Sequence, residues 1–360
     1  MSGHDKKKQP GTLHVRPGVD GGGDGLPAGG GSRRRDLSAA QYIDGVLAGD
    51  RVLLARAITL IESNAPAHQE VAQEVLTSLL ERRCESIRVG ITGVPGAGKS
   101  TFIEALGTLL TGRGHQVAVT AVDPSSSLTG GSILGDKTRM EKLAADPNAF
   151  IRPSPTGGTL GGVARKTRET IMLFEAAGFD VILVETVGVG QSEIQVRSMV
   201  DFFLLVLLAG AGDELQGIKK GVVEIADAIL INKADGQNLA AAKRARSEFE
   251  RVLHYLRPAT EGWTTGAFLS SAAKGQGVEQ MWAVVEEFAE LTRASGVFAG
   301  RRAAQEQAWV RTLVREGLDD LFMSHTGMPG LMADLEQKVS RGELPATAAA
   351  KRLLEMFKKK

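Results

Sequence analysis

Residues 93–101 read Gly93-Val94-Pro95-Gly96-Ala97-Gly98-Lys99-Ser100-Thr101, and the first eight match the pattern G-x-x-x-x-G-K-S. The stretch follows an apolar run at residues 87–92, which predicts a buried strand, and it precedes a helical pattern that extends to about residue 110. Glycines let backbone N–H groups converge on phosphate oxygens where a Cβ atom would intrude, and the N-terminus of the following helix adds positive potential. The sequence therefore predicts a phosphate-binding loop. In it, Lys99 should reach the β and γ phosphates, and the Ser100 hydroxyl should ligate magnesium.

A second signature, Asn232-Lys233-Ala234-Asp235, follows an apolar strand at residues 229–231. GTPases generally recognise guanine with N-K-x-D, because the carboxylate accepts hydrogen bonds from two guanine donors that adenine does not present. Lys233 would pack its stem along the base, and Asn232 would tie the loop together. Four residues alone are a weak match, and a polar turn after a strand is the alternative. The phosphate loop upstream favours guanine recognition, as does a stretch after the next strand where GTPases place a backbone contact to the guanine oxygen: Ser271, Ala272 and Ala273.

Acidic residues follow two further predicted strands. Asp123 ends the strand at residues 117–122, and Glu185 ends the strand at residues 181–184. The usual second switch of a GTPase reads D-x-x-G, so Glu185-Thr-Val-Gly188 is a departure, although the glutamate can still hold a magnesium-bound water. The Gly188 N–H can still face the γ phosphate. Residues 123–127 and 130–140 form the predicted first switch, with Asp136 near the metal. Helix caps or surface charges are the alternative, but Mg²⁺ prefers hard oxygen ligands and takes one or two carboxylates. The candidate ligands are Ser100, Asp123, Asp136 and Glu185.

The middle of the chain alternates apolar strands with helical stretches. Further strands are expected at residues 202–208 and 267–269. Continuous apolar strands between helices predict an α/β fold, a P-loop NTPase with a mostly parallel sheet flanked by helices. The candidate site residues fall at the carboxyl ends of these strands, where open α/β sheets bind ligands. Their convergence on one edge is therefore predicted.

The flanking regions predict four parts. Residues 1–35 are Gly-rich and polar, so we expect a disordered leader, because they cannot bury enough apolar surface to offset the entropy of ordering. Residues 36–84 predict at least two helices, broken at residues 64–66, and residues 85–295 predict the P-loop domain. Residues 296–360 form a C-terminal helical region. From residue 276 onward the expected helices span residues 276–293, 302–323, 329–341 and 345–358.

Composition excludes several classes of protein. Lys and Arg total 43 against 42 Asp and Glu, a balance that argues against a dedicated nucleic-acid or membrane-surface binder. The single cysteine, Cys84, excludes an intrachain disulfide and a thiolate metal cluster. The most apolar run, residues 202–208, is far shorter than the roughly 20 residues of a membrane span, and the first 35 residues have no apolar signal sequence. We expect a cytoplasmic location.

These stretches resemble the MeaB/ArgK-type GTPase chaperones of adenosylcobalamin-dependent acyl-CoA mutases, a family whose human relative serves methylmalonyl-CoA mutase. The most specific matches are Gly130-Gly-Ser-Ile-Leu-Gly-Asp-Lys-Thr-Arg-Met140 and Glu185-Thr-Val-Gly-Val-Gly-Gln-Ser192. In that family Glu185 is the expected residue. The resemblance extends from about residue 36 to the C-terminus, and it departs only at the Gly-rich leader. The other matching stretches are residues 55–63, 93–101, 121–127 and 232–235.

The resemblance implies properties that spacing alone does not show. It implies a homodimer formed through the C-terminal helices, about residues 301–360. It also implies an additional mobile segment at residues 212–220, in which Asp213 and Lys219 are candidates for coupling nucleotide state to the partner. That partner would be a mutase of the methylmalonyl-CoA type, whose adenosylcobalamin loading and repair the GTPase gates.

Taken together, these patterns predict a magnesium-dependent GTPase that acts as a chaperone of such a mutase. Two alternatives are a small-molecule kinase, against which residues 232–235 argue, and a nucleotide-sensing scaffold without useful catalysis. The sequence does not identify the residue that positions the attacking water. The residues expected to serve catalysis are Lys99, Glu185, Gly188, Asp213 and Lys219.

Overall fold

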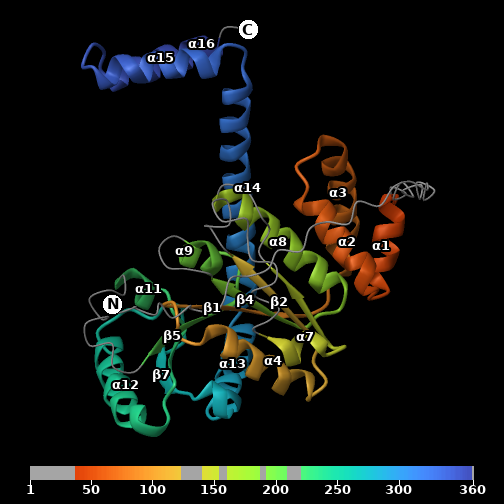
Figure 1. Cartoon of the computed structure of the whole chain (residues 1–360), viewed down its shortest axis with the longest axis vertical. Helices are drawn as coiled ribbons and strands as arrows, with labels where there is room; N and C mark the ends of the chain where they lie inside the picture. The colour runs from red at the N-terminus through yellow and green to blue at the C-terminus, as the bar shows by residue number, and fades with distance from the viewer. Residues whose placement is uncertain (1–36, 123–139, 154–159, 187–191, 209–219, 359–360) are drawn as a thin grey trace, which may run out of the picture. The chain divides into compact units, whose positions relative to one another are not determined.

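The computed structural model describes residues 37–122, 140–153, 160–186, 192–208 and 220–358 (Figure 1). Residues 38–360 form one compact unit. The expectation about residues 1–35 therefore lies outside the described residues, as do the predicted first switch at residues 123–127 and most of the 130–140 stretch. Among the described residues, no helix is both long and apolar enough to cross a membrane.

Seven parallel strands form one sheet in the order β3-β2-β4-β1-β5-β6-β7 (Figure 1). This arrangement confirms the predicted α/β class with a parallel sheet. One strand, β3, was not predicted. The strands are β1 (Ile87–Gly93), β2 (Val117–Val122), β3 (Ala149–Arg152), β4 (Val181–Thr186), β5 (Phe202–Leu208), β6 (Ala228–Asn232) and β7 (Gly266–Leu269).

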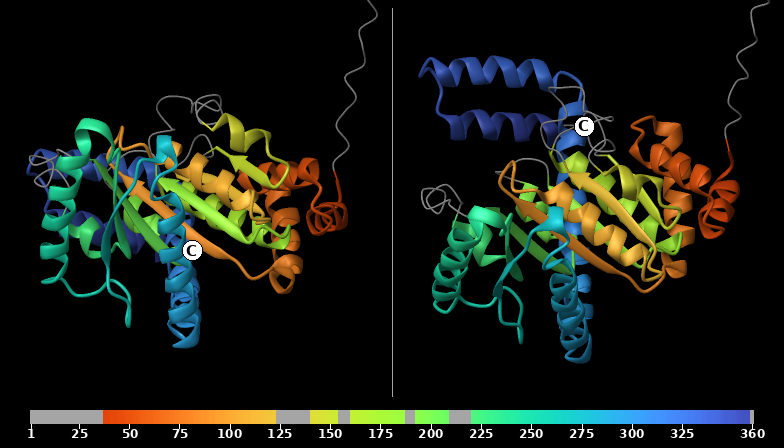
Figure 2. Two further views of the ribbon diagram at one scale, coloured as in Figure 1. Left: turned by 90° about the horizontal axis from the view of Figure 1, so that it is seen from below. Right: turned by 60° about the horizontal axis from the view of Figure 1, so that its bottom comes forward.

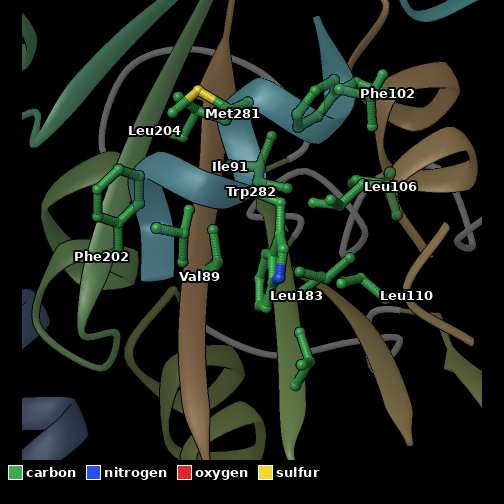
Figure 3. Packing of buried hydrophobic residues seen from close by; sticks show 14 of the residues in the cluster. Val89, Ile91, Phe102, Leu106, Leu110, Leu183, Phe202, Leu204, Met281 and Trp282 are labelled. Atoms are coloured by element: carbon green, nitrogen blue, oxygen red, sulfur yellow. The ribbon is translucent and has the colours of Figure 1, made fainter. Parts of the chain in front are cut away.

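Two helices, α4 (Lys99–Thr111) and α13 (Val278–Ala294), cover one face of the sheet. Their apolar side chains pack against those side chains of the central strands that point toward this face of the sheet (Figure 3). The labelled side chains of this core are Val89, Ile91, Phe102, Leu106, Leu110, Leu183, Phe202, Leu204, Met281 and Trp282.

The opposite face carries α8 (Leu160–Ala176) and the short α9 (Ser192–Arg197). Gly90 in the centre of β1 makes room for α9: a Cβ atom there would lie 2.8 Å from Val196 and 2.9 Å from Val200. Because real Cβ atoms do not approach so closely, a side chain at this position would push α9 off the sheet. The absence of one lets α9 and its following turn pack directly on the central strand.

The remaining helices flank this core. The N-terminal region forms three, and the break between the first two falls at Gly49, which has a φ of 69°, and at Asp50, which caps the second helix with its carboxylate. At the other end, α14 begins at Val297, earlier than the predicted residue 302, and α15 and α16 lie side by side after it (Figure 2). The helices are α1 (Ala39–Leu47), α2 (Arg51–Glu62), α3 (Pro66–Leu79), α7 (Glu141–Ala145), α11 (Lys220–Glu224), α12 (Leu239–Leu253), α14 (Val297–Ser324), α15 (Met328–Ser340) and α16 (Ala346–Lys358).

Buried ion pairs hold the amino ends of the central strands. Arg88 of β1 makes two hydrogen bonds to Glu175 of α8, Nε to Oε1 at 2.7 Å and Nη2 to Oε2 at 2.9 Å. Asp201, just before β5, accepts two hydrogen bonds from Arg302 of α14 at 2.7 and 2.6 Å. Burial alone would raise the pKa of Glu175, but Arg88, the Ser86 hydroxyl and Arg302 together outweigh burial and leave the pKa below its ordinary value. These pairs anchor α8 and α14 at the edge opposite the predicted site.

Candidate nucleotide site at the carboxyl edge of the sheet

The predicted phosphate loop connects β1 to α4. Gly93 ends β1 with a φ of 146°, and a Cβ atom there would lie 1.9 Å from the Val206 carbonyl oxygen of β5. Gly96 and Gly98 also have positive φ values, 79° and 84°. Gly98 is the N-cap of α4, so the loop delivers its backbone directly to the N-terminus of that helix. This is the strand–loop–helix geometry that anion binding requires.

Lys99 and Ser100 occupy the first turn of α4. The Lys99 ammonium donates to the carbonyl oxygens of Gly93 at 2.8 Å and Val94 at 3.4 Å, so it lies across its own loop. The Ser100 hydroxyl donates to Glu185 Oε1 at 3.0 Å. Glu185 lies on β4, the neighbour of β1 in the sheet, and is paired there with Ile91 of β1. The structure thus brings the loop hydroxyl and the strand carboxylate together.

This pair fits a magnesium ion in its donor chemistry. A hydroxyl and a carboxylate are hard oxygen ligands; Glu185 is buried and Ser100 is half-buried. Within the described ranges, no cluster of three or more His, Cys, Asp or Glu residues could hold a metal. That finding is compatible with magnesium, which takes one or two protein carboxylates and completes its shell with phosphate oxygens and water.

Asn232 at the end of β6 joins the phosphate loop to the predicted base loop. Its side-chain amide donates to the Ala97 carbonyl oxygen at 2.9 Å, and its Oδ1 accepts from the Ala272 N–H at 3.1 Å. The side chain is only 2% exposed. A Cβ atom on Gly98 would lie 2.7 Å from the Asn232 nitrogen, so the glycine is what permits this close approach. The side-chain bridge fixes the spacing of the two loops.

Asp235 and its neighbours form the predicted base-binding end. The Ser271 hydroxyl donates to the Asp235 carboxylate, and Lys274 Nζ lies 3.6 Å from Asp235 Oδ2. The hydrogen bond from Ser271 is the main cause that lowers the pKa of Asp235 below its ordinary value, with Lys274 adding to it. Asp235 is therefore ionised at neutral pH and able to accept two hydrogen bonds. Lys233 has a φ of 55°, a conformation that non-glycine residues adopt rarely and that is enriched at functional sites.

Five predicted site residues lie outside the described residues: Asp123, Asp136, Gly188, Asp213 and Lys219. The end of β2 nevertheless reaches the same edge, because Val122 pairs with Thr186 of β4. The other candidates converge there: the residues of the phosphate loop, Glu185, Asn232, Lys233, Asp235, and the turn that contains Ser271, Ala272 and Ala273.

Sequence reasoning missed two features of this edge. Lys274 completes the short 3₁₀ turn Ala272–Lys274 and contacts Asp235, a role that its position directly after Ala273 could have indicated. The hydroxyls of Thr92 and Thr186 lie 2.9 Å apart and are buried. They link β1 to β4 beside the last paired residues, and no local sequence pattern reveals a contact between residues so distant in the chain.

Comparison with known proteins is consistent with this geometry. The model of the protein family described as "Methylmalonyl Co-A mutase-associated GTPase MeaB" matches residues 54–327. GTPase ArgK of Escherichia coli is 47% identical over 288 residues, which cover 80% of this chain and 87% of that protein. The mouse protein named "Methylmalonic aciduria type A homolog, mitochondrial" is 46% identical over 324 residues, covering 87% of this chain and 78% of that protein.

Among solved structures, the crystal structure of an LAO/AO transport system kinase matches with a TM-score of 0.73 and 36% sequence identity. The match covers 89% of this chain and 98% of that chain. Fold and sequence similarity therefore extend together over most of the chain.

The two loop glycines provide a matched pair of substitutions. Gly93→Ala should destabilise the fold by about 3 kcal/mol or more, because its Cβ atom would collide with the backbone of β5. At Gly96 no atom lies within 4 Å of the added Cβ. Gly96→Ala should therefore destabilise the fold by only about 1 to 2 kcal/mol, the cost of placing alanine in the left-handed conformation. Urea unfolding of both variants measures the difference. Equal costs at the two positions would contradict the close approach of β1 and β5.

Proposed function

The chain belongs to the MeaB family of methylmalonyl Co-A mutase-associated GTPases, and we propose from this that it gates the loading and protection of adenosylcobalamin in a mutase of the methylmalonyl-CoA type. It is a GTPase. In the proposed mechanism, GTP lies along the carboxyl edge of the sheet with magnesium. Its hydrolysis to GDP and phosphate changes the nucleotide-bound state of the GTPase that the mutase encounters. The partner named in the family description is the basis for the choice of a mutase as client.

One observation carries the nucleotide part of the proposal: the side chain of Asn232 bonds to both the phosphate loop and the Ser271–Ala273 turn. A triphosphate at the first and a guanine at the second would then belong to one molecule of GTP. The proposed nucleotide contacts come from residues 93–101, Asn232, Lys233, Asp235, Ser271, Ala272 and Ala273.

The phosphate end supplies charge and hydrogen bonds where negative charge develops. We assign Lys99 to the β and γ phosphates, since its ammonium already lies over the loop that would cradle them. Ser100 and Glu185 would hold magnesium, directly or through water, together with Asp123 and Asp136. Bound there, magnesium would neutralise charge on the phosphate oxygens during hydrolysis. By family resemblance, Gly188 would present its N–H to the γ phosphate, and Asp213 and Lys219 would couple nucleotide state to the partner.

The base end explains the choice of GTP. The ionised Asp235 carboxylate can accept from guanine N1–H and the exocyclic amine, while adenine offers no matching pair of donors. Ser271 and Lys274 hold the carboxylate in place without occupying all of its acceptor positions. With adenine bound in place of guanine, the Asp235 carboxylate would be left without these donors, and this unpaired acceptor disfavours ATP.

Asp235→Asn should therefore exchange nucleotide preference. The amide donates where the carboxylate accepted, so GTP affinity should fall about 100-fold while affinity for xanthosine triphosphate rises. Titration calorimetry with GTP, ATP and xanthosine triphosphate measures the change. Asp334→Asn, at an exposed position on α15, is the matched control and should bind as the wild type does. Equal affinity of the wild type for ATP and GTP would contradict guanine recognition.

The client is tested by turnover. If the mutase regulates this GTPase, purified methylmalonyl-CoA mutase should raise the rate of phosphate release from GTP by about tenfold or more, as partner proteins do for other GTPases that turn over slowly alone. Lys99→Ala should show no such release with or without mutase, which controls for contaminating phosphatases. A wild-type rate unaffected by the mutase would instead favour a nucleotide-sensing scaffold.

We also propose that the chain is a homodimer joined through α14 and the helices after it. An apolar stripe with helical spacing runs along α14, and each of its side chains is more than half exposed: Val310 (60%), Val314 (56%), Leu318 (52%) and Leu321 (61%). Such a stripe on a soluble helix commonly marks an interface between proteins. A second copy of α14 is the proposed occupant, since the family resemblance implies dimerisation through these helices.

Val314→Glu should shift the protein from dimer to monomer, because it places a charge in the centre of that apolar contact. Ala308→Glu is the matched control: Ala308 is exposed, and the helical period of 3.6 residues puts it about 120° around α14 from Val314, away from the stripe. Light scattering at micromolar concentration measures both. A wild type that is already monomeric, or a Val314→Glu variant that stays dimeric, would overturn this interface.

A further inference from the structure

Helix α9 is hydrogen-bonded to α14 through its C-terminal end. Gln305 of α14 donates from Nε2 to the Val200 carbonyl oxygen at 2.9 Å and to the Arg197 carbonyl oxygen at 3.3 Å. Arg197 is the last residue of α9, and Val200 belongs to the turn after it. In the chain, α9 begins six residues after Thr186, the last residue of β4, and Glu185 precedes that. The helix held by α14 is therefore the next one after the strand that carries Glu185.

A shared carboxylate strengthens this junction. Asp227, before β6, is fully buried and lies 3.0 Å from Arg197 Nη1 of α9 and 3.6 Å from Arg301 Nη1 of α14. Thr260 donates to the same carboxylate and accepts from Arg301. Burial raises the pKa of Asp227 and lowers that of Arg197, so each charge depends on its partners. Displacing one arginine changes the environment of the other.

The junction also holds acceptors that can take new partners. Gln195 Oε1 on α9 and Gln305 Oε1 on α14 are buried and make no hydrogen bond to any part of the chain that the structure describes. Arg168 of α8 adds a second link, since it donates to the Ser198 carbonyl oxygen and stacks over Trp309 of α14, 4.9 Å from the ring centre. A small movement of α9 would therefore exchange partners at several points on α14.

We propose that Gln305 and Arg301 of α14 are positioning residues for GTP hydrolysis. Neither reaches the nucleotide edge. Gln305 bonds to the end of α9, Arg301 shares Asp227 with Arg197 of α9, and α9 packs on β4, the strand that carries Glu185. Because α14 also carries α15 and α16, the same contacts link the hydrolytic edge to the C-terminal helices. The inference rests on the proposed role of Glu185. Linkage of this kind is reciprocal for binding, so events at the C-terminal helices would also alter nucleotide affinity.

Gln305→Met tests the proposal, because methionine has a similar length and helix propensity but donates no hydrogen bond. We expect kcat for GTP to fall about five- to tenfold, with KM for GTP and affinity for GDP within about twofold of the wild type. Gln307→Met, two residues along α14 with an exposed side chain, should leave kcat unchanged. Arg301→Lys, which keeps the charge but loses the branched contact, should lower kcat in the same direction.

Sites are counted by bound GDP, so that unfolded protein does not lower kcat. A lower melting temperature with unchanged kcat per site would mean a purely structural role and would overturn the proposal, as would a raised KM with unchanged kcat. Failure of the proposed function gives a different result: Lys99→Ala would keep its turnover, or the wild type would bind ATP as well as GTP. If the wild type meets both criteria and Gln305→Met still turns over normally, only the positioning role is wrong.

Discussion

The two hydrogen bonds of the Asn232 side chain set the geometry on which the candidate site depends. The phosphate loop follows β1 and the Ser271–Ala273 turn follows β7, and β5 and β6 separate these strands in the sheet. A side chain at the end of β6 is therefore in a position to hold both loops, and it needs one donor and one acceptor to do so. An asparagine amide has both groups, whereas an ionised aspartate would lack the donor toward Ala97.

The opposite edge of the sheet, at the amino ends of the strands, is held by a different kind of contact. There the contacts are buried ion pairs, such as Arg88 with Glu175 and Arg302 with Asp201, which fasten helices to the strands. Pairs of this kind stabilise only when each charge keeps its partner, so they tolerate little change. The carboxyl edge instead carries loops built on glycines, together with polar side chains such as Lys99, Glu185 and Asn232. The sheet thus separates a rigid anchoring edge from an edge that can respond to a ligand.

Sequence reasoning succeeded where the physical signal is local. Apolar runs predicted six of the seven strands, and the loops around Lys99 and Asn232 were placed at one edge because parallel strands all point the same way. It failed for β3, whose four residues end in a half-buried arginine, and for the start of α14, since residues 297–301 show no early apolar period. It also missed Arg88–Glu175 and Arg197–Asp227–Arg301. Those partners lie far apart in the chain, and only the fold makes them neighbours.

The length of α14 has a mechanical consequence. Its 28 residues extend about 42 Å at about 1.5 Å per residue, and the contacts that Arg302, Gln305 and Trp309 make lie in its first half. A helix held at one end acts as a lever arm. A tilt of about 5° at its base would sweep the far end through about 4 Å, more than the length of a hydrogen bond. Movements of α9 that are too small to disturb the sheet would thus produce larger displacements of α15 and α16. A neighbouring protein bound to these helices would meet a changed surface.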